Sequence, residues 1–416
     1  MFPRFFHIIA YYILIKTFVD KANIVYYNKL KYYPSEAAMF RKTYLEIDLE
    51  ALKHNISEVK EKFPDYGYYF GVVKANAYGA GIYCVNAMEE AGINYFAVSS
   101  LEEALSLRKI NKTAPVLVME PICFEGLDTA AENNITVTVD SAEYFDRMLA
   151  AGKKITFHIK IDCGMNRFGL TDKKDVEHIF KNADENLRLE GVFTQLSSGS
   201  GERFEKQMEL FNERTSLIDL SEVKIVHIDR SLTVEQHKKL DFANGVRLGI
   251  VMYGFAKTPP ELSFRRRLFN KITGKKPPSP SKLLLKNVFR FYTEVLEIKR
   301  IKPGESVGYG GMFDSKEDSF VAVLPYGFAD FSLIGKTCVY IGGKKRDIIV
   351  NYMDVTAALV DGGVKPGDKV EIFGDELSPR AASRQAGVNV YKLITSITNR
   401  VPRVYVENGK ANEVKY

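Results

Sequence analysis

Short apolar segments alternate with helix-like segments between residues 68 and 255, and this alternation is the feature that most constrains the fold. Near-continuous apolar runs of this kind are typical of parallel strands that are buried on both faces. Because each run is followed by a helix-like segment or a turn, a closed (β/α)8 barrel is favoured over an open sheet. The predicted strands are 68–73, 95–99, 115–120, 136–139, 156–161, 189–194, 224–228 and 245–247, and the predicted helices include 101–109, 141–150 and 203–219.

The pattern changes after residue 255, where a basic segment with several prolines precedes a run of strand-like segments. These include "VFRFYTEVLEIKRI", "FVAVLPYGF", "TCVYIGG" and "DKVEIFG", with turn signals such as "KPG" between them. We therefore predict a barrel domain over 39–256, a linker over 257–283 and a mostly β C-terminal domain over 284–416. The first strand of the barrel segment is expected to pack with the β domain.

The positive charge of the chain is local. The formal net charge is +6, but residues 261–290 contain nine Lys and Arg side chains against one acid, Glu261. A solvated linker is the favoured interpretation, so we expect neither a nucleic-acid nor a membrane partner. Four widely spaced cysteines without a CxxC pair indicate no metal site and fit a reducing, cytoplasmic location.

Residues 1–38 precede the barrel pattern and contain the apolar stretch "FFHIIAYYILIKTFV". Lys16 interrupts this stretch, which is shorter than the ~20 residues that a spanning helix needs. A small-residue cleavage site of the kind that ends a signal peptide does not follow it. We expect residues 1–38 to be either an N-terminal extension or a start-site artefact.

The stretch "VVKANAYGAG", residues 72–81, ends a predicted strand on Lys74. A surface lysine that closes a strand is one interpretation, and a lysine placed to form a Schiff base is the other. In a barrel, chemistry gathers at the carboxyl ends of the strands, and loops after strands seven and eight commonly hold phosphate. Further residues expected at this rim are Arg167, Ser231, Arg247, Gly249 and Ile250. A lysine amine beside a phosphate site indicates pyridoxal 5′-phosphate (PLP).

These residues and several motifs resemble those of the alanine racemase family of fold-type III PLP enzymes. "VVKANAYGAG" is similar to the PLP-lysine motif, and "HIKIDCGMNRFGL" and "VRLGIVMYG" resemble two further barrel motifs. "SVGYGGMF", "VAVLPYGFAD", "YMD" and "ITNRVPRVY" resemble the β-domain motifs in the same order. The resemblance runs from about residue 41 to residue 406.

The resemblance implies a two-base racemase that acts as a homodimer with shared active sites. Lys74 would hold PLP and act as the acid and base on one face of the substrate carbon. Tyr309, contributed by the partner subunit, would act on the opposite face. Arg247 would face the pyridine nitrogen and keep it unprotonated, because a second positive charge beside a guanidinium is costly.

Other residues are given substrate or cofactor contacts by the same resemblance. Arg167 would meet the substrate carboxylate or the 3′-oxygen of PLP, and Lys160 corresponds to a lysine that is often carbamylated in the family. Met353 and Asp354 would reach into the active site of the partner. The cofactor-binding set implied in full is Lys74, Tyr78, Ser231, Arg247, Gly249, Ile250 and Tyr391.

Three motifs depart from the family pattern. Gln195 in "FTQLSS" stands where a histidine usually follows the threonine and contacts the pyridine-facing arginine. "IDRSLT" replaces an Asn-Ser-Ala-like run, and Leu248 replaces a proline. The implied function is interconversion of L- and D-alanine for peptidoglycan synthesis. Alternatives are racemisation of another amino acid such as serine, fold-type III decarboxylation, or non-catalytic PLP binding.

Overall fold

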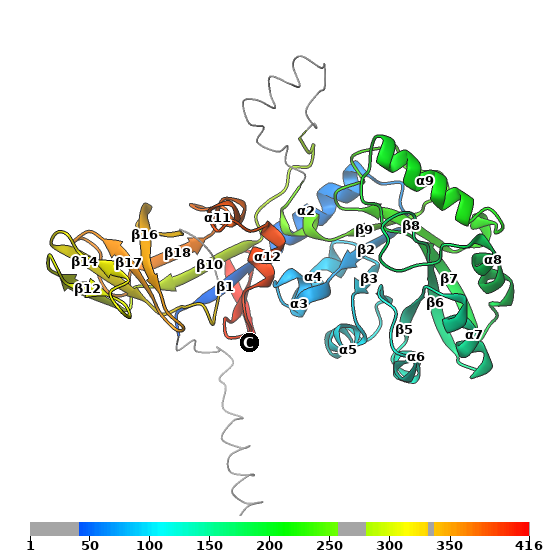
Figure 1. Cartoon of the computed structure of the whole chain (residues 1–416), viewed down its shortest axis with the longest axis horizontal. Coiled ribbons are helices and arrows are strands. Elements are labelled where there is room, and N and C mark those ends of the chain that lie inside the picture. The colour runs from blue at the N-terminus through cyan, green and yellow to red at the C-terminus, as the bar shows by residue number, and fades with distance from the viewer. Residues whose placement is uncertain (1–40, 257–279, 332–336, 416) are drawn as a thin grey trace, which may run out of the picture. The chain divides into compact units, whose positions relative to one another are not determined.

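Eight parallel strands form a closed barrel in the computed structural model, which describes residues 41–256, 280–331 and 337–415. The predicted barrel and the mostly β second domain are both confirmed (Figure 1). The barrel strands are β2 (Tyr68–Val72), β3 (Tyr95–Val98), β4 (Val116–Val118), β5 (Ile135–Val139), β6 (Ile155–Lys160), β7 (Leu187–Phe193), β8 (Ile225–Arg230) and β9 (Gly245–Leu248). The strands pair in chain order, and β9 closes the barrel against β2. Strands β3, β4, β5 and β9 are buried at every position, which is why their sequences are continuous apolar runs.

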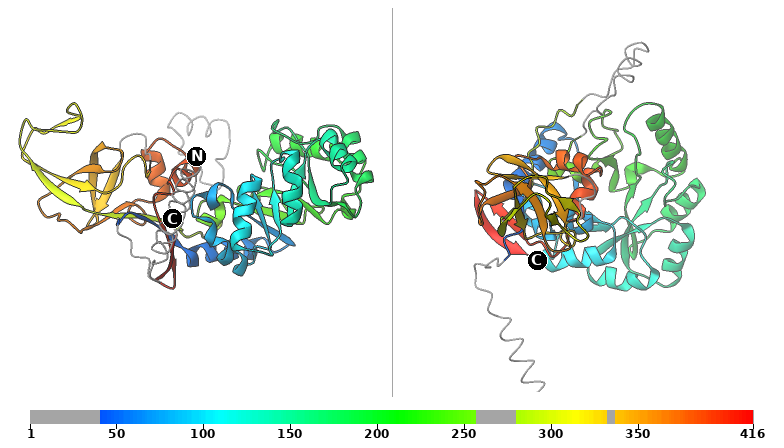
Figure 2. Two further views of the ribbon diagram at one scale, coloured as in Figure 1. Left: turned by 90° about the horizontal axis from the view of Figure 1, so that it is seen from below. Right: turned by 60° about the vertical axis from the view of Figure 1, so that its left-hand side comes forward.

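Helices pack outside the barrel strands, as Figures 1 and 2 show for α5 to α9. Several begin at a capping side chain: Ser100 and Ser141 accept the backbone N–H of the residue three positions later. The helices of this part are α2 (Leu49–Lys62), α3 (Lys74–Tyr78), α4 (Val85–Glu90), α5 (Leu101–Ile110), α6 (Leu127–Glu132), α7 (Ala142–Ala150), α8 (Lys173–Asn182) and α9 (Glu202–Arg214). Short 3-10 turns are η1 (Ile82–Cys84), η2 (Phe124–Gly126), η3 (Leu220–Glu222) and η4 (Ile250–Tyr253).

The helix predicted over 203–219 is shorter at its carboxyl end, because α9 ends at Arg214. The Thr215 hydroxyl donates to the Phe211 carbonyl at 2.8 Å, which satisfies a carbonyl of the last turn locally. A few residues later, the Asp219 carboxylate accepts the N–H of Ser221 and starts the separate turn η3. Hydrogen bonds from the Thr215 and Asp219 side chains to nearby backbone groups therefore take the place of the last predicted helical turn.

The second domain contains a ten-stranded sheet with the order β11-β14-β17-β16-β15-β18-β10-β1-β19-β20. Strand β1 precedes the barrel in sequence but lies inside this sheet, antiparallel to β10 and parallel to β19. The strands are β1 (Tyr44–Asp48), β10 (Phe289–Glu294), β11 (Glu297–Ile301), β14 (Ser319–Leu324), β15 (Cys338–Ile341), β16 (Lys344–Asn351), β17 (Thr356–Val360), β18 (Lys369–Phe373), β19 (Arg403–Glu407) and β20 (Lys410–Lys415). A separate hairpin joins β12 (Ser306–Val307) to β13 (Phe313–Asp314), and two helices complete the domain, α11 (Pro379–Gln385) and α12 (Val390–Thr395).

Side chains of β19 bond the segment that follows Lys74. The Arg403 guanidinium donates to the Gly79 carbonyl at 3.1 Å, and the Tyr405 hydroxyl donates to the Ala80 carbonyl at 3.0 Å. A Cβ on Gly79 would lie 2.2 Å from the Ile394 carbonyl oxygen, and one on Gly81 would lie 2.2 Å from the Tyr405 hydroxyl. The two glycines of "AYGAG" thus permit a close approach that no larger residue allows.

Part of the predicted organisation lies outside the described residues. The N-terminal segment 1–38 and most of the predicted linker, 257–279, belong to this part of the chain. Among the described residues, no helix is long and apolar enough to span a membrane, and no group of three His, Cys, Asp or Glu side chains is placed to hold a metal ion.

Candidate active site

A cavity of about 170 Å³ lies at the carboxyl ends of the barrel strands, around Lys74. Eight predicted site residues line it together. The full lining is Val72, Lys74, Tyr78, Met119, Met165, Arg167, Gln195, Arg230, Ser231, Arg247, Gly249, Ile250 and Tyr391. A larger hollow of about 400 Å³ at the other end of the barrel, which Tyr95, Arg108 and Glu190 help to line, contains none of the predicted site residues.

The charge of this cavity has one sign. Four cationic side chains line it, Lys74, Arg167, Arg230 and Arg247, and no carboxylate is among the described residues that do so. Arg247 is buried, and the other three are partly or fully accessible. A concave, partly enclosed surface that carries only positive charges concentrates anions. The cavity is therefore suited to ligands that carry phosphate or carboxylate groups.

The segment after Lys74 makes an unusual backbone turn. Ala75, Asn76, Ala77 and Tyr78 all have φ between 52° and 57°, in the left-handed region. Left-handed helical backbone costs roughly 1–2 kcal/mol per residue for residues other than glycine, and such strain is concentrated at functional sites. Two hydrogen bonds hold the turn: Ala75 N–H donates to the Glu103 carboxylate at 2.6 Å, and Ile82 N–H donates to the Asn76 side-chain oxygen at 2.9 Å.

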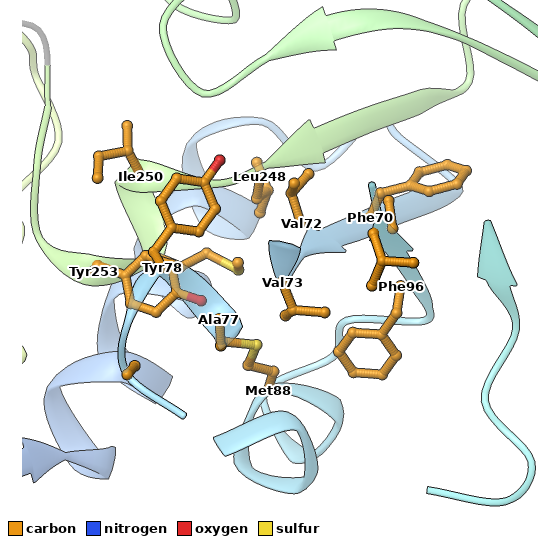
Figure 3. Packing of buried hydrophobic residues seen from close by; sticks show 14 of the residues in the cluster. Phe70, Val72, Val73, Ala77, Tyr78, Met88, Phe96, Leu248, Ile250 and Tyr253 are labelled. Atoms are coloured by element: carbon orange, nitrogen blue, oxygen red, sulfur yellow. The ribbon is translucent and has the colours of Figure 1, made fainter. Parts of the chain in front are cut away.

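Ser231, Gly249 and Tyr78 form one wall of the cavity, where β8 and β9 end. The Ser231 hydroxyl accepts the Gly249 N–H at 2.7 Å, and a Cβ on Gly249 would lie 2.6 Å from the Tyr78 hydroxyl. The Tyr391 ring lies 6.0 Å from the Tyr78 ring, centroid to centroid, and Figure 3 shows Tyr78 near Ile250. Burial raises the pKa of both phenols, so they are neutral hydrogen-bond donors.

Arg247 is held rigidly by backbone and side-chain acceptors. It donates to the Thr194 and His227 carbonyls, each at 2.6 Å, and to the His227 Nδ1 at 2.9 Å. Burial lowers the pKa of Arg247 to about 10, so the guanidinium stays charged at neutral pH. Because a guanidinium only donates, His227 must accept on Nδ1 and carry its proton on Nε2, which lies 2.9 Å from His158 Nδ1.

The expected contact between Gln195 and Arg247 is present but long. The Gln195 side-chain oxygen lies 3.5 Å from Arg247 Nη2, whereas the His227 ring and carbonyl are much closer. His227 was missed from the sequence, although a histidine inside the apolar, fully buried segment "IVHI" is a signal that could have drawn attention to it. Orientation of Arg247 therefore depends mainly on β8 and less on Gln195.

Lys160 ends β6, and Arg167 on the following loop acts on it through its charge. Lys160 is buried beside the Phe168 ring, with Nζ 3.8 Å from the ring centroid. Burial lowers the pKa of Lys160 to about 7, and the charges of Arg167 and Arg247 act in the same direction. A second feature missed from the sequence is Asp162, whose carboxylate accepts the N–H groups of residues 164–167 at 2.9–3.2 Å and so shapes the Arg167 loop.

Tyr309, Met353 and Asp354 are separate from this cavity within the chain. Tyr309 follows β12, has 85% of its surface exposed, and packs edge-on against Tyr352 at 5.8 Å between ring centroids. Met353 is 56% exposed, and the Asp354 carboxylate accepts from Arg400 at 2.7 Å. The β domain thus presents these three predicted side chains to solvent, and none lines the Lys74 cavity.

The closed parallel barrel, the β domain and the cationic cavity at Lys74 together define a two-domain enzyme of the fold-type III class. Residues 47–257 match the N-terminal domain of alanine racemase, and residues 288–405 match its C-terminal domain. The chain belongs to the alanine racemase family, which confirms the resemblance found in its motifs.

Individual relatives match over nearly their whole length. Alanine racemase 1 of Bacillus subtilis is 33% identical over 400 residues, which covers 92% of this chain and 97% of the relative. The crystal structure of the Bacillus anthracis alanine racemase with bound L-Ala-P has a TM-score of 0.78 at 31% identity and covers 91% of this chain and 98% of that one. A histidine racemase from Leuconostoc mesenteroides, 20% identical with a TM-score of 0.75, shares the fold. It covers 89% of this chain and 99% of its own.

Proposed function

We propose that this protein interconverts L- and D-alanine with PLP as cofactor and supplies D-alanine for peptidoglycan synthesis. The observation that carries the proposal is the cavity at Lys74, where four cations and no carboxylate line the described wall. PLP carries a phosphate and an amino-acid substrate carries a carboxylate, so two anions must be accommodated beside one amine. Full-length matches to alanine racemases support alanine over other amino acids.

The residues present fit PLP. The Ser231 hydroxyl, the Gly249 backbone and the Tyr78 and Tyr391 hydroxyls would hold its phosphate, in a wall that a Cβ on Gly249 would fill. Arg247, fixed by His227, would face the pyridine nitrogen. When bound, PLP supplies an aldehyde that reacts with amines and a ring that accepts electrons from the substrate carbon.

Racemisation needs proton transfer on both faces of the substrate α-carbon. We assign one face to the Lys74 amine and the other to the phenol of Tyr309 of a partner subunit, because Tyr309 is exposed and lies outside the cavity of its own chain. Each group must come within hydrogen-bond reach of the same proton position. A homodimer in which the exposed β-domain residues Met353 and Asp354 also reach the partner cavity would complete the site.

Arg167 is the proposed partner of the substrate carboxylate. The charge of its guanidinium acts on the buried Lys160 amine, and the two cations repel each other. With a pKa of about 7, Lys160 is partly a neutral amine at neutral pH, which is the form that attacks carbon dioxide. A carbamate on Lys160 would carry a negative charge and pair with Arg167.

The test is chiral chromatography of single amino acids incubated with the purified full-length protein and PLP. We expect L- and D-alanine each to reach a racemic mixture, Lys74→Ala to abolish the reaction, and the exposed-site control Lys174→Ala to leave it unchanged. Turnover of serine but not alanine would contradict the proposed substrate, and racemisation that survives in Lys74→Ala would contradict the proposed site. The four described cysteines are free thiols, which fits the proposed cytoplasmic location.

A further inference from the structure

Arg230 lies at the end of β8, directly before Ser231, and lines the Lys74 cavity. The family motif has an asparagine-like residue at this point, so the cation is a property of this chain. Neither the motif nor the roles proposed above give it a function. It nevertheless places a full positive charge on the wall that holds the phosphate donors.

The contacts of Arg230 fix its orientation without neutralising it. Its Nε donates to the Leu196 carbonyl at 3.0 Å, and its Nη2 lies 3.4 Å from the Ser197 carbonyl. Neutral carbonyls are its only acceptors among the described residues, where it forms no ion pair with a carboxylate. The neighbouring Asp229 carboxylate accepts instead from Tyr66, Thr233 and His237 at 2.8–2.9 Å.

Arg230 is coupled electrostatically to the two tyrosines of the phosphate wall and, like Arg167, to Arg247. Its charge acts on the phenols of Tyr78 and Tyr391, the two tyrosines of the phosphate wall. Arg167, by contrast, acts on Lys160 across the cavity. The Arg230 guanidinium is partly buried, and this burial lowers its pKa. A nearby anion would stabilise its charged form.

We propose that Arg230 is a cofactor-binding residue that pairs with the phosphate of PLP. The inference rests on the proposed function. Ser231, Gly249, Tyr78 and Tyr391 offer only neutral donors, whereas a phosphate monoester carries about −1.5 to −2 charges at neutral pH. Arg230 supplies the missing cation in a planar donor group that suits phosphate oxygens, and its charge-assisted hydrogen bonds are stronger than neutral ones.

The experiment compares PLP with pyridoxal, which lacks the phosphate, as titrants of the full-length protein after cofactor removal. We expect Arg230→Gln to raise the dissociation constant of PLP by roughly 10- to 100-fold, the range for loss of a charged hydrogen bond. Pyridoxal should bind the variant and the wild type within about twofold, since no phosphate contact is lost. Arg230→Lys keeps the charge but loses the planar pair of donors, so its dissociation constant for PLP should lie between those of the wild type and Arg230→Gln. The exposed Arg188→Gln, at the opposite end of the barrel, serves as the control for a general loss of charge.

Two results would overturn the assignment of Arg230. Unchanged PLP affinity in Arg230→Gln would remove it from the phosphate site, and an equal loss for PLP and pyridoxal would make its role structural. If Arg230→Gln does not fold, Arg230→Asn, which introduces the residue type of the family motif, carries the same comparison. A wild-type protein that binds neither titrant would refute the proposed function itself, whereas normal binding with an unaffected variant would refute only the role of Arg230.

Discussion

The Lys160 amine is in a place where an ammonium ion is poorly solvated. Its described neighbours include two aromatic rings, a carbonyl at 3.5 Å and the charges of Arg167 and Arg247. The carboxylates of Glu120 and Asp140 act in the opposite direction, with a smaller effect. Because burial and like charges both disfavour protonation, the neutral amine is present near pH 7. This protonation state is the physical reason to expect carbamylation here and at few other lysines.

Lys160 should show a pH-dependent carbamate signal. In protein equilibrated with ¹³C-bicarbonate, we expect a carbamate resonance that grows as pH rises through about 7, because the neutral amine adds carbon dioxide and releases a proton. The resonance should be absent from Lys160→Gln and retained in Lys154→Gln, a variant of an exposed lysine just before the same strand. A resonance that persists in Lys160→Gln would place the carbamate elsewhere.

Loss of the Tyr309 hydroxyl should slow proton removal from the two substrate enantiomers unequally. If Lys74 acts on D-alanine and Tyr309 on L-alanine, Tyr309→Phe should slow racemisation by the ~10²–10⁴ that loss of one positioned proton-transfer group produces. Exchange of the α-proton with deuterated solvent should survive better from D-alanine than from L-alanine, since Lys74 can still remove and return a proton on its own face. Mass spectrometry of each enantiomer measures this ratio, and equal loss from both would contradict the assignment of the two bases.

Cavity residues could be predicted from the sequence where they lie in a motif or at the end of a predicted strand. Lys74, Arg167 and Arg247 all line the predicted cavity, since each stands at or near the end of a barrel strand. His227 and Asp162 were missed because they act through other residues: one bonds Arg247 and the other bonds backbone N–H groups of the Arg167 loop. Indirect roles of this kind depend on contacts between side chain and backbone that strand periodicity does not encode.

At the scale of elements, the left-handed turn after Lys74 could not be read from the sequence. The predicted strand 68–73 ends at Val72, and residues 75–78 form a turn with positive φ, although alanine normally favours right-handed helix. Contacts with Glu103 and with β19 hold this backbone in place. Tertiary contacts have overridden local propensity, which is expected at a functional site and invisible to local rules.

Substitutions at Ala75 should reveal the strain in this turn. Ala75 is exposed and has φ of 53°, so its side chain can be changed without disturbing the core. A β-branched residue fits positive φ poorly and glycine fits it well, so we expect Ala75→Val to be less stable than Ala75→Gly by roughly 1–3 kcal/mol. Urea denaturation measures the difference in the free energy of unfolding. As a control, Ala150→Gly in the right-handed helix α7 should be less stable than the wild type. Equal stability of the two Ala75 variants would show that the turn is not strained.

At the scale of the whole molecule, strand β1 links the two ends of the described chain. It pairs with both β10 and β19, so the segment before the barrel completes the sheet of the C-terminal domain. Strand alternation alone cannot assign a strand to one of two sheets, so the strand pattern by itself did not determine this arrangement. Tyr309, the proposed second base, does not line the described cavity at Lys74, so the proposed function depends on the assembly of two chains.

A complementation experiment tests whether two chains share each site. In a dimer of one Lys74→Ala subunit and one Tyr309→Phe subunit, one site carries both changes and the other carries neither. Random mixing of equal amounts makes half of the dimers mixed, and two-fold symmetry gives each mixed dimer one intact site of two. We therefore expect about a quarter of wild-type activity, although each variant alone has little. Subunit exchange is verified by mass spectrometry of differently labelled chains. The matched control mixes Lys74→Ala with Lys74→Ala,Tyr309→Phe, which leaves no intact site in any dimer and should stay inactive. Verified exchange without recovery in the first mixture would show that Lys74 and Tyr309 do not act across a dimer.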